Sequence, residues 1–372
     1  MSDSPVRVCI ILGTRPEAIK LAPVIGQFRQ CPLFDTRVIL TGQHREMVAQ
    51  VMQLFQIEAD DDLAIMQPRQ TLTDITCRSL QGLERLFQNL EPQFVIVQGD
   101  TTTAFAAAIA AFYQKIPVGH VEAGLRTADL LNPYPEEANR RLISQITQLH
   151  FAPTPQAVEN LKTSAVVGTI HHTGNTVIDA LITVAARQPA CDVPGLDWSR
   201  YRVLLSTVHR RENWGRPLAD IAHGFLKILD AVPDAALLLP LHRNPTVREP
   251  LQAKLGDHPR VFLTEPLNYA ELVGAIQRCY LLLTDSGGLQ EEAPSLGKPV
   301  LVLRQTTERP EAIAAGTAQL VGTSSQQIFT AASRLLSNPA AYQQMATAIN
   351  PFGDGHAAEK ILAAVQRFFS LV

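Results

Sequence analysis

The sequence has few cysteines and few aromatic residues, and its charges almost balance. Its 372 residues include 6% aromatics and carry a net charge of −3. Five cysteines are scattered without a C-x-x-C pair or a metal-binding spacing: Cys9, Cys31, Cys77, Cys191 and Cys279. Such an odd set is typical of reduced thiols rather than of a disulfide framework. The near-zero charge argues against a nucleic-acid partner, but it allows a local basic pocket.

Long hydrophobic runs are also absent. No apolar stretch approaches the roughly 18 residues of a membrane-spanning helix. The apolar run at residues 8–12 is too short for a signal peptide. We therefore expect a soluble cytoplasmic protein without a membrane partner. The Gly-x-Gly-x-x-Gly fingerprint of a dinucleotide site is missing too, which argues against an NAD cofactor, and we expect neither a cofactor nor a metal.

What the sequence does contain is an alternation of short apolar runs and longer helical patterns. Hydrophobic residues make up 46% of the chain, and its length suggests two domains. The first half predicts strands at 6–12, 36–41, 94–98 and 118–121, and helices at 16–30, 46–55, 71–90, 102–114 and 135–149. Strands that alternate with helices in this way indicate a parallel sheet.

The same alternation restarts after a looser, linker-like stretch at 187–197. It predicts strands at 202–208, 235–241, 261–264, 281–284 and 299–303, and helices at 218–231, 246–255, 268–279, 290–296, 326–336 and 357–369. The fold class is therefore α/β, with two doubly wound Rossmann-like domains facing a cleft. We assign residues 1–186 to the first domain and 187–354 to the second, with segment 355–372 packing back on the first. Such sheets bind ligands at the carboxyl ends of their strands.

Basic residues follow the first predicted strand. Pro16 suits the first turn of a helix, whose free amides attract an anion, and Arg15 and Lys20 add positive charge. The segment is not a P-loop, because position 18 is Ala and Leu follows Lys20. An ordinary strand–helix turn with surface basic residues remains an equal alternative.

Carboxylates follow the next strands. Asp100 comes after strand 94–98, where it points into the cleft or simply caps the next helix. Glu122 directly follows a buried strand, which costs free energy unless the carboxylate is paired, with Arg126 for example, or functional. Glu136 opens a helix beside Glu137, and a favourable interaction with the helix dipole would by itself explain both.

Two segments of the second half carry polar groups at strand ends. His209 precedes two arginines, a pattern that points to phosphate contact or proton transfer, although a lone histidine is more often merely packed. After strand 281–284, Ser286 and two glycines allow close approach of a diphosphate to the backbone. Glu292, one turn later, is placed to accept hydrogen bonds from a ribose. A plain glycine turn is the alternative, and Arg309 follows the next strand.

Together these segments resemble one family. They are Gly-Thr-Arg-Pro-Glu (13–17), Gly-Asp-Thr-Thr-Thr (99–103), His-Val-Glu-Ala-Gly-Leu-Arg-Thr (120–127), Pro-Glu-Glu-Ala-Asn-Arg (135–140), Asp-Ser-Gly-Gly-Leu-Gln-Glu-Glu (285–292) and Thr-Glu-Arg-Pro-Glu (307–311). In this order and spacing they resemble the bacterial non-hydrolysing UDP-N-acetylglucosamine 2-epimerases. The resemblance implies a glycosyltransferase-B-like fold, a homodimer, and interconversion of UDP-GlcNAc and UDP-ManNAc, which feeds surface polysaccharide synthesis.

The resemblance also implies roles for individual residues. The catalytic set would be Asp100, Glu122, Glu136 and His209. Substrate and UDP would be held by Arg15, Lys20, Leu272, Ser286, Gly287, Gly288, Glu292 and Arg309. Some members bind a second UDP-GlcNAc as an activator, and the matching positions here are Gln43, His44, Arg69, Gln70, Arg210 and His242. Position 46 is Glu, where regulated members can carry Gln.

The chemistry explains why several carboxylates are needed. The C2 hydrogen of the sugar is not acidic, so the C1–O bond must break first, with UDP leaving and charge developing at the anomeric carbon. A base then removes the C2 proton to give a glycal, and UDP adds back after protonation on the other face. Acids and bases are therefore needed on both faces. Asp100 or Glu122 is the candidate for C2 proton transfer, with Glu136 as its opposite-face partner.

Three other functions fit the same residues. A glycosyltransferase on this fold would use a UDP-sugar and an acceptor, and fold alone does not distinguish it. A hydrolysing epimerase would release free ManNAc and UDP. A sensor would bind the nucleotide sugar without turnover. The many acids at strand ends favour epimerisation.

Overall fold

The structure is a computed structural model, and it describes residues 4–43, 45–67 and 69–371. The chain forms two compact units, one made of residues 1–180 and 352–372 and the other of residues 181–351. Helix α7 (Thr176–Ala185) contains the first boundary, and the looser stretch 187–197 lies within the second unit. No helix in the described ranges is long and apolar enough to cross a membrane.

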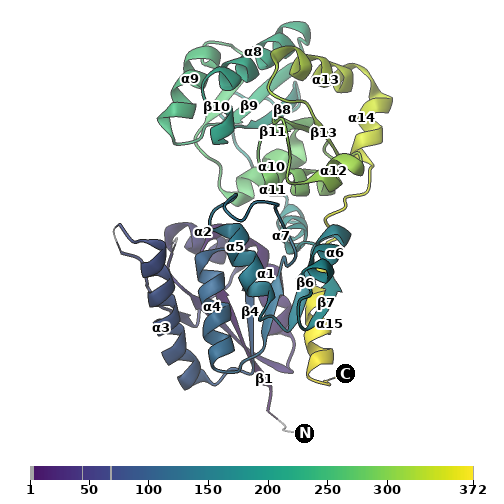
Figure 1. Ribbon diagram of the computed structural model, residues 1–372. Coiled ribbons are helices and arrows are strands. Elements are labelled where there is room, and N and C mark those ends of the chain that lie inside the picture. Colours follow the sequence, from purple (N-terminus) through teal and green to yellow (C-terminus); the bar gives the residue numbers. More distant parts are fainter. Residues whose placement is uncertain (1–3, 44, 68, 372) are drawn as a thin grey trace. The chain divides into compact units, whose positions relative to one another are not determined.

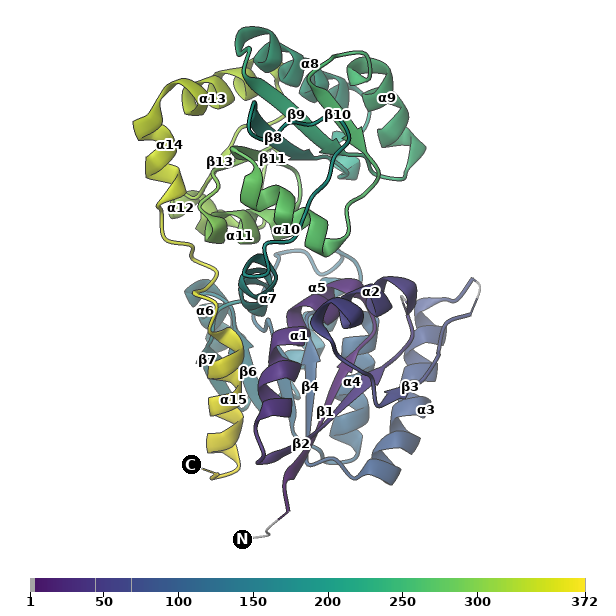
Figure 2. The ribbon, with the colours of Figure 1, turned by 180° about the vertical axis from the view of Figure 1, so that it is seen from behind.

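The first unit is built on a parallel sheet with the strand order β3-β2-β1-β4-β5-β6-β7 (Figures 1 and 2). Its strands are β1 (Val6–Leu12), β2 (Phe34–Leu40), β3 (Asp61–Asp62), β4 (Phe94–Gln98), β5 (Val118–Val121), β6 (Leu149–Ala152) and β7 (Thr169–His172). Its helices are α1 (Arg15–Gln30), α2 (Arg45–Phe55), α3 (Leu72–Leu90), α4 (Thr102–Tyr113), α5 (Glu136–Ser144), α6 (Pro155–Thr163), the start of α7 and α15 (Ala357–Phe368). β1 and β4 are buried almost throughout, as strands covered by helices on both faces must be.

Helix α15 returns to the first unit from the far end of the chain. It packs beside α1 (Figure 2). The ring of Phe94 on β4 meets those of Phe368 and Phe369. The N-terminus of α15 is capped by Asp179, whose carboxylate accepts a hydrogen bond from the Ala358 amide at 2.8 Å. The C-terminal helix is thus part of the first unit's core.

The second unit has its own parallel sheet, with the strand order β10-β9-β8-β11-β12-β13. Its strands are β8 (Arg202–Thr207), β9 (Ala235–Pro240), β10 (Val261–Thr264), β11 (Leu281–Thr284), β12 (Val300–Val302) and β13 (Ala318–Leu320). Its helices are α8 (Arg216–Ala231), α9 (Pro245–Leu255), α10 (Tyr269–Arg278), α11 (Gly287–Glu292), α12 (Pro310–Ala314), α13 (Ser325–Ser337) and α14 (Pro339–Ala346). Leu, Ile and Val side chains of α8, α9 and α13 pack on β8, β9 and β11 to form its core.

The predicted α/β class with two Rossmann-like sheets is confirmed. The predicted helix 135–149 is wrong at its end, because α5 stops at Ser144 and β6 begins at Leu149. Strands β6 and β7 were not predicted. Each has four residues, and histidines at 150, 171 and 172 interrupt their apolar pattern.

Candidate functional site

The predicted functional residues follow strands at the point where each sheet reverses its winding order. In the first sheet β1 lies between β2 and β4, so the connections after β1 and β4 leave toward opposite edges. In the second sheet β8 and β11 hold the equivalent places. The crevice between two such diverging connections is the general ligand site of doubly wound sheets. Arg15 and Asp100 follow the first pair of strands, and His209 and Ser286 follow the second.

Glu122, directly after β5, is a buried carboxylate with three kinds of donor. Lys20 Nζ on α1 lies 2.7 Å from Oε1 and 2.6 Å from Oε2. Gln98, the last residue of β4, donates to Oε2, and Asn175 Nδ2 donates to Oε1 at 3.2 Å. The Glu122 side chain is 5% exposed, and its backbone is left-handed, with φ +63°. The partner is thus Lys20 and not Arg126, which donates to Leu125 O and Ser144 Oγ.

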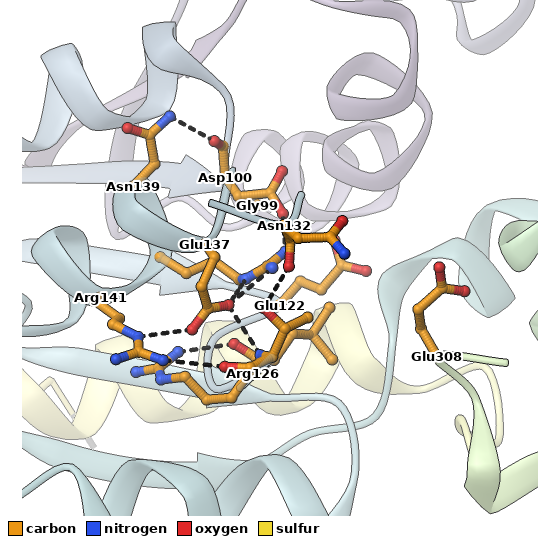
Figure 3. A network of polar contacts seen from close by, with 12 residues as sticks. Gly99, Asp100, Glu122, Arg126, Asn132, Glu137, Asn139, Arg141 and Glu308 are labelled. Carbon is orange, nitrogen blue, oxygen red and sulfur yellow. Dashed lines mark hydrogen bonds and ion pairs between the residues drawn. The ribbon is translucent and has the colours of Figure 1, made fainter. Parts of the chain in front are cut away.

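Asp100, after β4, is held by α5 and does not cap the next helix. Thr101 is the N-cap of α4, and its side chain accepts from the Ala104 amide. Arg140 Nη1 lies 2.5 Å from Asp100 Oδ2, and Asn139 Nδ2 donates to the Asp100 carbonyl at 2.8 Å (Figure 3). Burial raises the pKa of the Asp100 carboxyl and the nearby Glu122 charge adds to this, while Arg140 opposes both.

Glu137, which is completely buried, contacts two arginines of its own helix α5 and the backbone of Thr127. Its carboxylate accepts from Arg140 Nη2 at 2.8 Å, from Arg141 Nε at 2.7 Å and from the Thr127 amide at 3.0 Å (Figure 3). Burial acts to raise the pKa of Glu137, but the hydrogen bonds from both arginines outweigh it and lower the pKa. Glu137 is therefore a structural anion that holds Arg140 against Asp100.

Glu136, the first residue of α5, is arranged differently from its neighbour. Its carboxylate oxygen Oε2 is buried and accepts no hydrogen bond from any residue that the structure describes. A buried acceptor without a donor costs free energy unless a further group supplies one. The Oε2 of Glu136 thus lacks the internal donors that hold the carboxylate of Glu137.

The turn between β1 and α1 is fixed by Glu17, which is buried. Its Oε2 accepts from the amides of Gly13 and Thr14 at 3.0 and 2.7 Å, and its Oε1 accepts from Thr101 Oγ1 at 2.7 Å. The turn that carries Arg15 is thereby tied to the residue after Asp100. A larger residue at Gly13 would force Thr41 to move, because a Cβ there would lie 2.1 Å from Thr41 Oγ1.

A buried histidine is hydrogen-bonded to the turn that carries Asp100. His120 Nε2 on β5 donates to the Gly99 carbonyl at 2.7 Å, and Gly99 has a φ of +71°. Burial lowers the pKa of His120 to about 3, so its imidazole is neutral. His120 thus acts as a fixed hydrogen-bond donor and not as a proton carrier.

In the second unit two guanidinium groups lie beside Gly287, at the start of α11. A Cβ built at Gly287 would lie 3.6 Å from Arg210 Nη2 and 4.0 Å from Arg309 Nη2, so both guanidinium groups flank its backbone. Arg210 Nε is buried and has no hydrogen-bond partner among the described residues. Arg309 is oriented by Glu291 through its Nε. Backbone amides at the start of a helix, flanked by two guanidinium groups, suit a diphosphate.

The remaining predicted nucleotide contacts lie around α10 and α11. Ser286 is the N-cap of α11, and a Cβ at Gly288 would meet Glu292 Oε1 at 3.4 Å. Glu292 Oε2 accepts from Tyr269 OH at 3.3 Å, and Leu272 lies half-buried one turn further along α10. Glu292 is therefore already oriented by a phenol before any ligand binds.

The predicted activator residues are distributed over both units. Gln43 Oε1 accepts a 3.4 Å hydrogen bond from Thr103, which lies in the segment that follows Asp100. Gln70 Nε2 donates to Ile65 O. Arg69 is exposed with a φ of +60°. In the second unit the ring of His242 stacks on His209, with centroids 6.1 Å apart, and Arg210 is described above. His44 lies outside the described residues.

In the described part of the chain no three His, Cys, Asp or Glu side chains are grouped so that they could hold an ion. The carboxylates described above are paired mainly with arginine or lysine side chains. The arrangement therefore offers carboxylates, an imidazole and guanidinium groups, and its chemistry is that of proton transfer and anion binding.

The two sheets place the chain in the glycosyltransferase-B class of α/β proteins. A family model described as UDP-N-acetylglucosamine 2-epimerase matches residues 27–366. The UDP-N-acetylglucosamine 2-epimerase of Escherichia coli K12 is 48% identical over 371 residues, covering 97% of this chain and 98% of its own length. The chain belongs to the UDP-N-acetylglucosamine 2-epimerase family, as its motifs predicted.

Solved structures agree with this assignment. The Neisseria meningitidis UDP-GlcNAc 2-epimerase bound to UDP-GlcNAc matches with a TM-score of 0.88 at 46% identity, over 97% of this chain and 100% of that chain. The Methanocaldococcus jannaschii enzyme in complex with UDP-GlcNAc and UDP matches with a TM-score of 0.77 at 32% identity, with the same coverage of both chains.

Proposed function

We propose that this protein interconverts UDP-GlcNAc and UDP-ManNAc without net hydrolysis, through elimination of UDP and its re-addition to a glycal. In the first half-reaction the C1–O bond breaks and its electron pair leaves with UDP. The C2 proton passes to a protein base, and the C2–H electrons form the C1=C2 double bond. In the second half-reaction a proton adds to the opposite face of C2, and UDP attacks C1.

The different surroundings of Asp100 and Glu122 support a division of labour between them. Glu122 is saturated with donors from Lys20, Gln98 and Asn175, which stabilise its ionised form. Such a carboxylate is a poor proton acceptor, but its fixed charge would stabilise the cationic sugar of the transition state. Asp100, with a single cation on one oxygen and a raised pKa, is better suited to carry the C2 proton.

Glu136 is assigned to the opposite face of C2. Its buried Oε2 has no donor among the described residues, so proton exchange with C2 through this oxygen would break no internal hydrogen bond. Arg15 and Lys20 would bind the substrate on the same unit. Lys20 would act in addition by holding Glu122 in place.

The departing UDP would be held by the second unit. Arg210, Arg309 and the amides at Gly287 and Gly288 can stabilise the charge that develops on the diphosphate. Ser286 would add a hydroxyl to this set. Glu292, oriented by Tyr269, would accept from the ribose, with Leu272 beside it.

The observation that carries the proposal is the placement of two carboxylates with unlike partners, Asp100 and Glu122, on adjacent strand ends in a member of this family. The test is to incubate the purified protein with UDP-GlcNAc in deuterated water and to follow the reaction by NMR. We expect UDP-ManNAc to accumulate with deuterium at C2 and without an added acceptor. Unlabelled UDP-ManNAc would contradict elimination, and free ManNAc would indicate hydrolysis.

The fall of kcat/KM at acidic pH should depend on Arg140. Asp100 must be ionised to accept a proton, so kcat/KM falls as the pH drops through its pKa, which is raised. Removing the Arg140 charge raises that pKa further, and Arg140→Gln should therefore move the acid limb to higher pH. Arg141→Gln is the matched control, because Arg141 contacts Glu137 but not Asp100. An unmoved limb in Arg140→Gln would argue against Asp100 as the base.

The wider setting is part of the same proposal. We place the enzyme in the cytoplasm as a homodimer that supplies surface polysaccharide synthesis. UDP-GlcNAc would also act as an activator, bound by Gln43, His44, Arg69, Gln70, Arg210 and His242. The five cysteines are all free, as a reducing compartment requires. Sedimentation at twice the chain mass would support the dimer, and strictly hyperbolic kinetics in UDP-GlcNAc would contradict activation.

A further inference from the structure

Asp285, directly after β11, is a buried carboxylate to which the proposed reaction assigns no role. It is 0% exposed. Its Oδ2 accepts from the amides of His209 and Arg210 at 2.9 and 2.8 Å, and from Asn213 Nδ2 at 3.0 Å. Its Oδ1 lies 3.1 Å from Nδ1 of the His209 ring. Asp285 therefore joins the ends of β8 and β11, where the second sheet reverses its winding order.

The contact with His209 constrains the position of a proton. Burial acts to raise the pKa of Asp285, but the hydrogen bond and charge of His209 and the backbone amides lower it overall, so Asp285 is ionised. An ionised carboxylate can only accept hydrogen bonds. The carboxylate oxygen 3.1 Å away therefore favours a hydrogen on Nδ1 of His209, and in the neutral ring Nε2 then holds the lone pair. The His209 side chain keeps 38% of its surface exposed, so Asp285 does not enclose the ring.

The residue that follows His209 lies beside Gly287 in the same unit. Arg210, the next residue, reaches within 3.6 Å of the Cβ position of Gly287. Asp285 accepts hydrogen bonds from the backbone amides of both His209 and Arg210. One carboxylate therefore fixes the backbone from which the imidazole and the Arg210 side chain extend.

We propose that Asp285 is a positioning residue that holds His209 as the Nδ1–H tautomer and thereby presents Nε2 to the bound nucleotide sugar. This role rests on the proposed function and on the place of His209 in the catalytic set that the family resemblance implies. Asparagine at position 285 would have to turn its single oxygen toward the three nitrogen donors of the loop. Its amide nitrogen would then face Nδ1 and favour the opposite tautomer, as in serine proteases whose triad aspartate is replaced.

The tautomer is measured directly by nitrogen-15 NMR of the full chain labelled at histidine. His209 in the wild-type protein should show a protonated Nδ1 and an unprotonated Nε2. Asp285→Asn should exchange the two signals. His209→Gln identifies the resonance, and a wild-type ring protonated at Nε2, or an unchanged tautomer in Asp285→Asn, would overturn the proposal. The wild-type spectrum decides even if the variant does not fold.

A double-mutant cycle connects the tautomer to turnover. Asp285→Asn should lower kcat by about 10²–10⁴ while the Kd for UDP stays within a few-fold of wild type. In the His209→Gln background the same substitution should cost almost nothing, because its effect passes through the ring. Equal losses in both backgrounds would mean a merely structural role and overturn the proposal. A fully active His209→Gln protein would instead contradict the role proposed for His209, and the NMR result would still report on Asp285.

Discussion

Asp100→Asn is expected to lower kcat by about 10²–10⁴ and to leave UDP affinity nearly unchanged. The amide has the shape of the carboxylate but cannot accept the C2 proton. Arg140 keeps its contact with Glu137, so the surrounding loop should retain its structure. Steady-state kinetics measure kcat, titration calorimetry measures the affinity for UDP, and a thermal melt measures the stability of the variant.

The control for this substitution is Asp257→Asn, which makes the same chemical change at an exposed position of the second unit. It should leave all three quantities unchanged. If Asp100→Asn lost UDP binding or unfolded early, Asp100 would be a structural partner of Arg140 rather than a base. If it kept full kcat, proton transfer would have to be reassigned to Glu122 or Glu136.

Glu137→Ala is expected to destabilise the first unit by about 3–5 kcal/mol, because it removes the carboxylate from a buried ion pair. The side chains of Glu137 and Arg140 are 0% and 8% exposed, so water cannot replace the lost partner. For a unit of this size the midpoint of thermal unfolding should fall by about 6–20 °C. Differential scanning calorimetry would record the shift in the transition of that unit.

Glu159→Ala is the matched control for Glu137→Ala. Glu159 also pairs with a basic residue three positions along its helix, but both side chains are largely exposed, and such pairs contribute little. The pKa of Glu137 is lowered in the folded protein, so its contribution is present above the usual carboxyl pKa and is lost as the pH falls through the lowered value. Equal melting shifts for the two variants at neutral pH would show that the buried network is not stabilising.

Much of the fold could be predicted because buried parallel strands are continuous apolar runs. The bounds of β1, β4, β5, β10 and β11 were predicted to the residue. β6 and β7 were missed, since their histidines break the pattern and His150 is accommodated by a contact to Val167 O, 17 residues away. Helix propensity alone likewise extended α5 past Ser144.

Some residues of the candidate site could likewise be predicted from the sequence, and others could not. Asp100, Glu122, His209 and Ser286 could be found because each lies within two residues of the end of a buried strand, where a polar side chain is conspicuous. Gln98, Asn175 and Glu17 could not, because an amide at the end of a strand or an acid in a helical first turn has an ordinary local explanation. Their importance comes from partners 24, 53 and 84 residues away.

The sequence by itself determined the family, the two α/β sheets and the strand ends at which polar side chains gather, because periodicity and motif order are local properties of the chain. Only the tertiary structure decided which charges meet. It gave Lys20 rather than Arg126 to Glu122, Arg140 to Asp100, and Asp285 to His209. Pairing depends on which strands become neighbours, and the free energy of a buried charge depends on the donors that this arrangement brings to it.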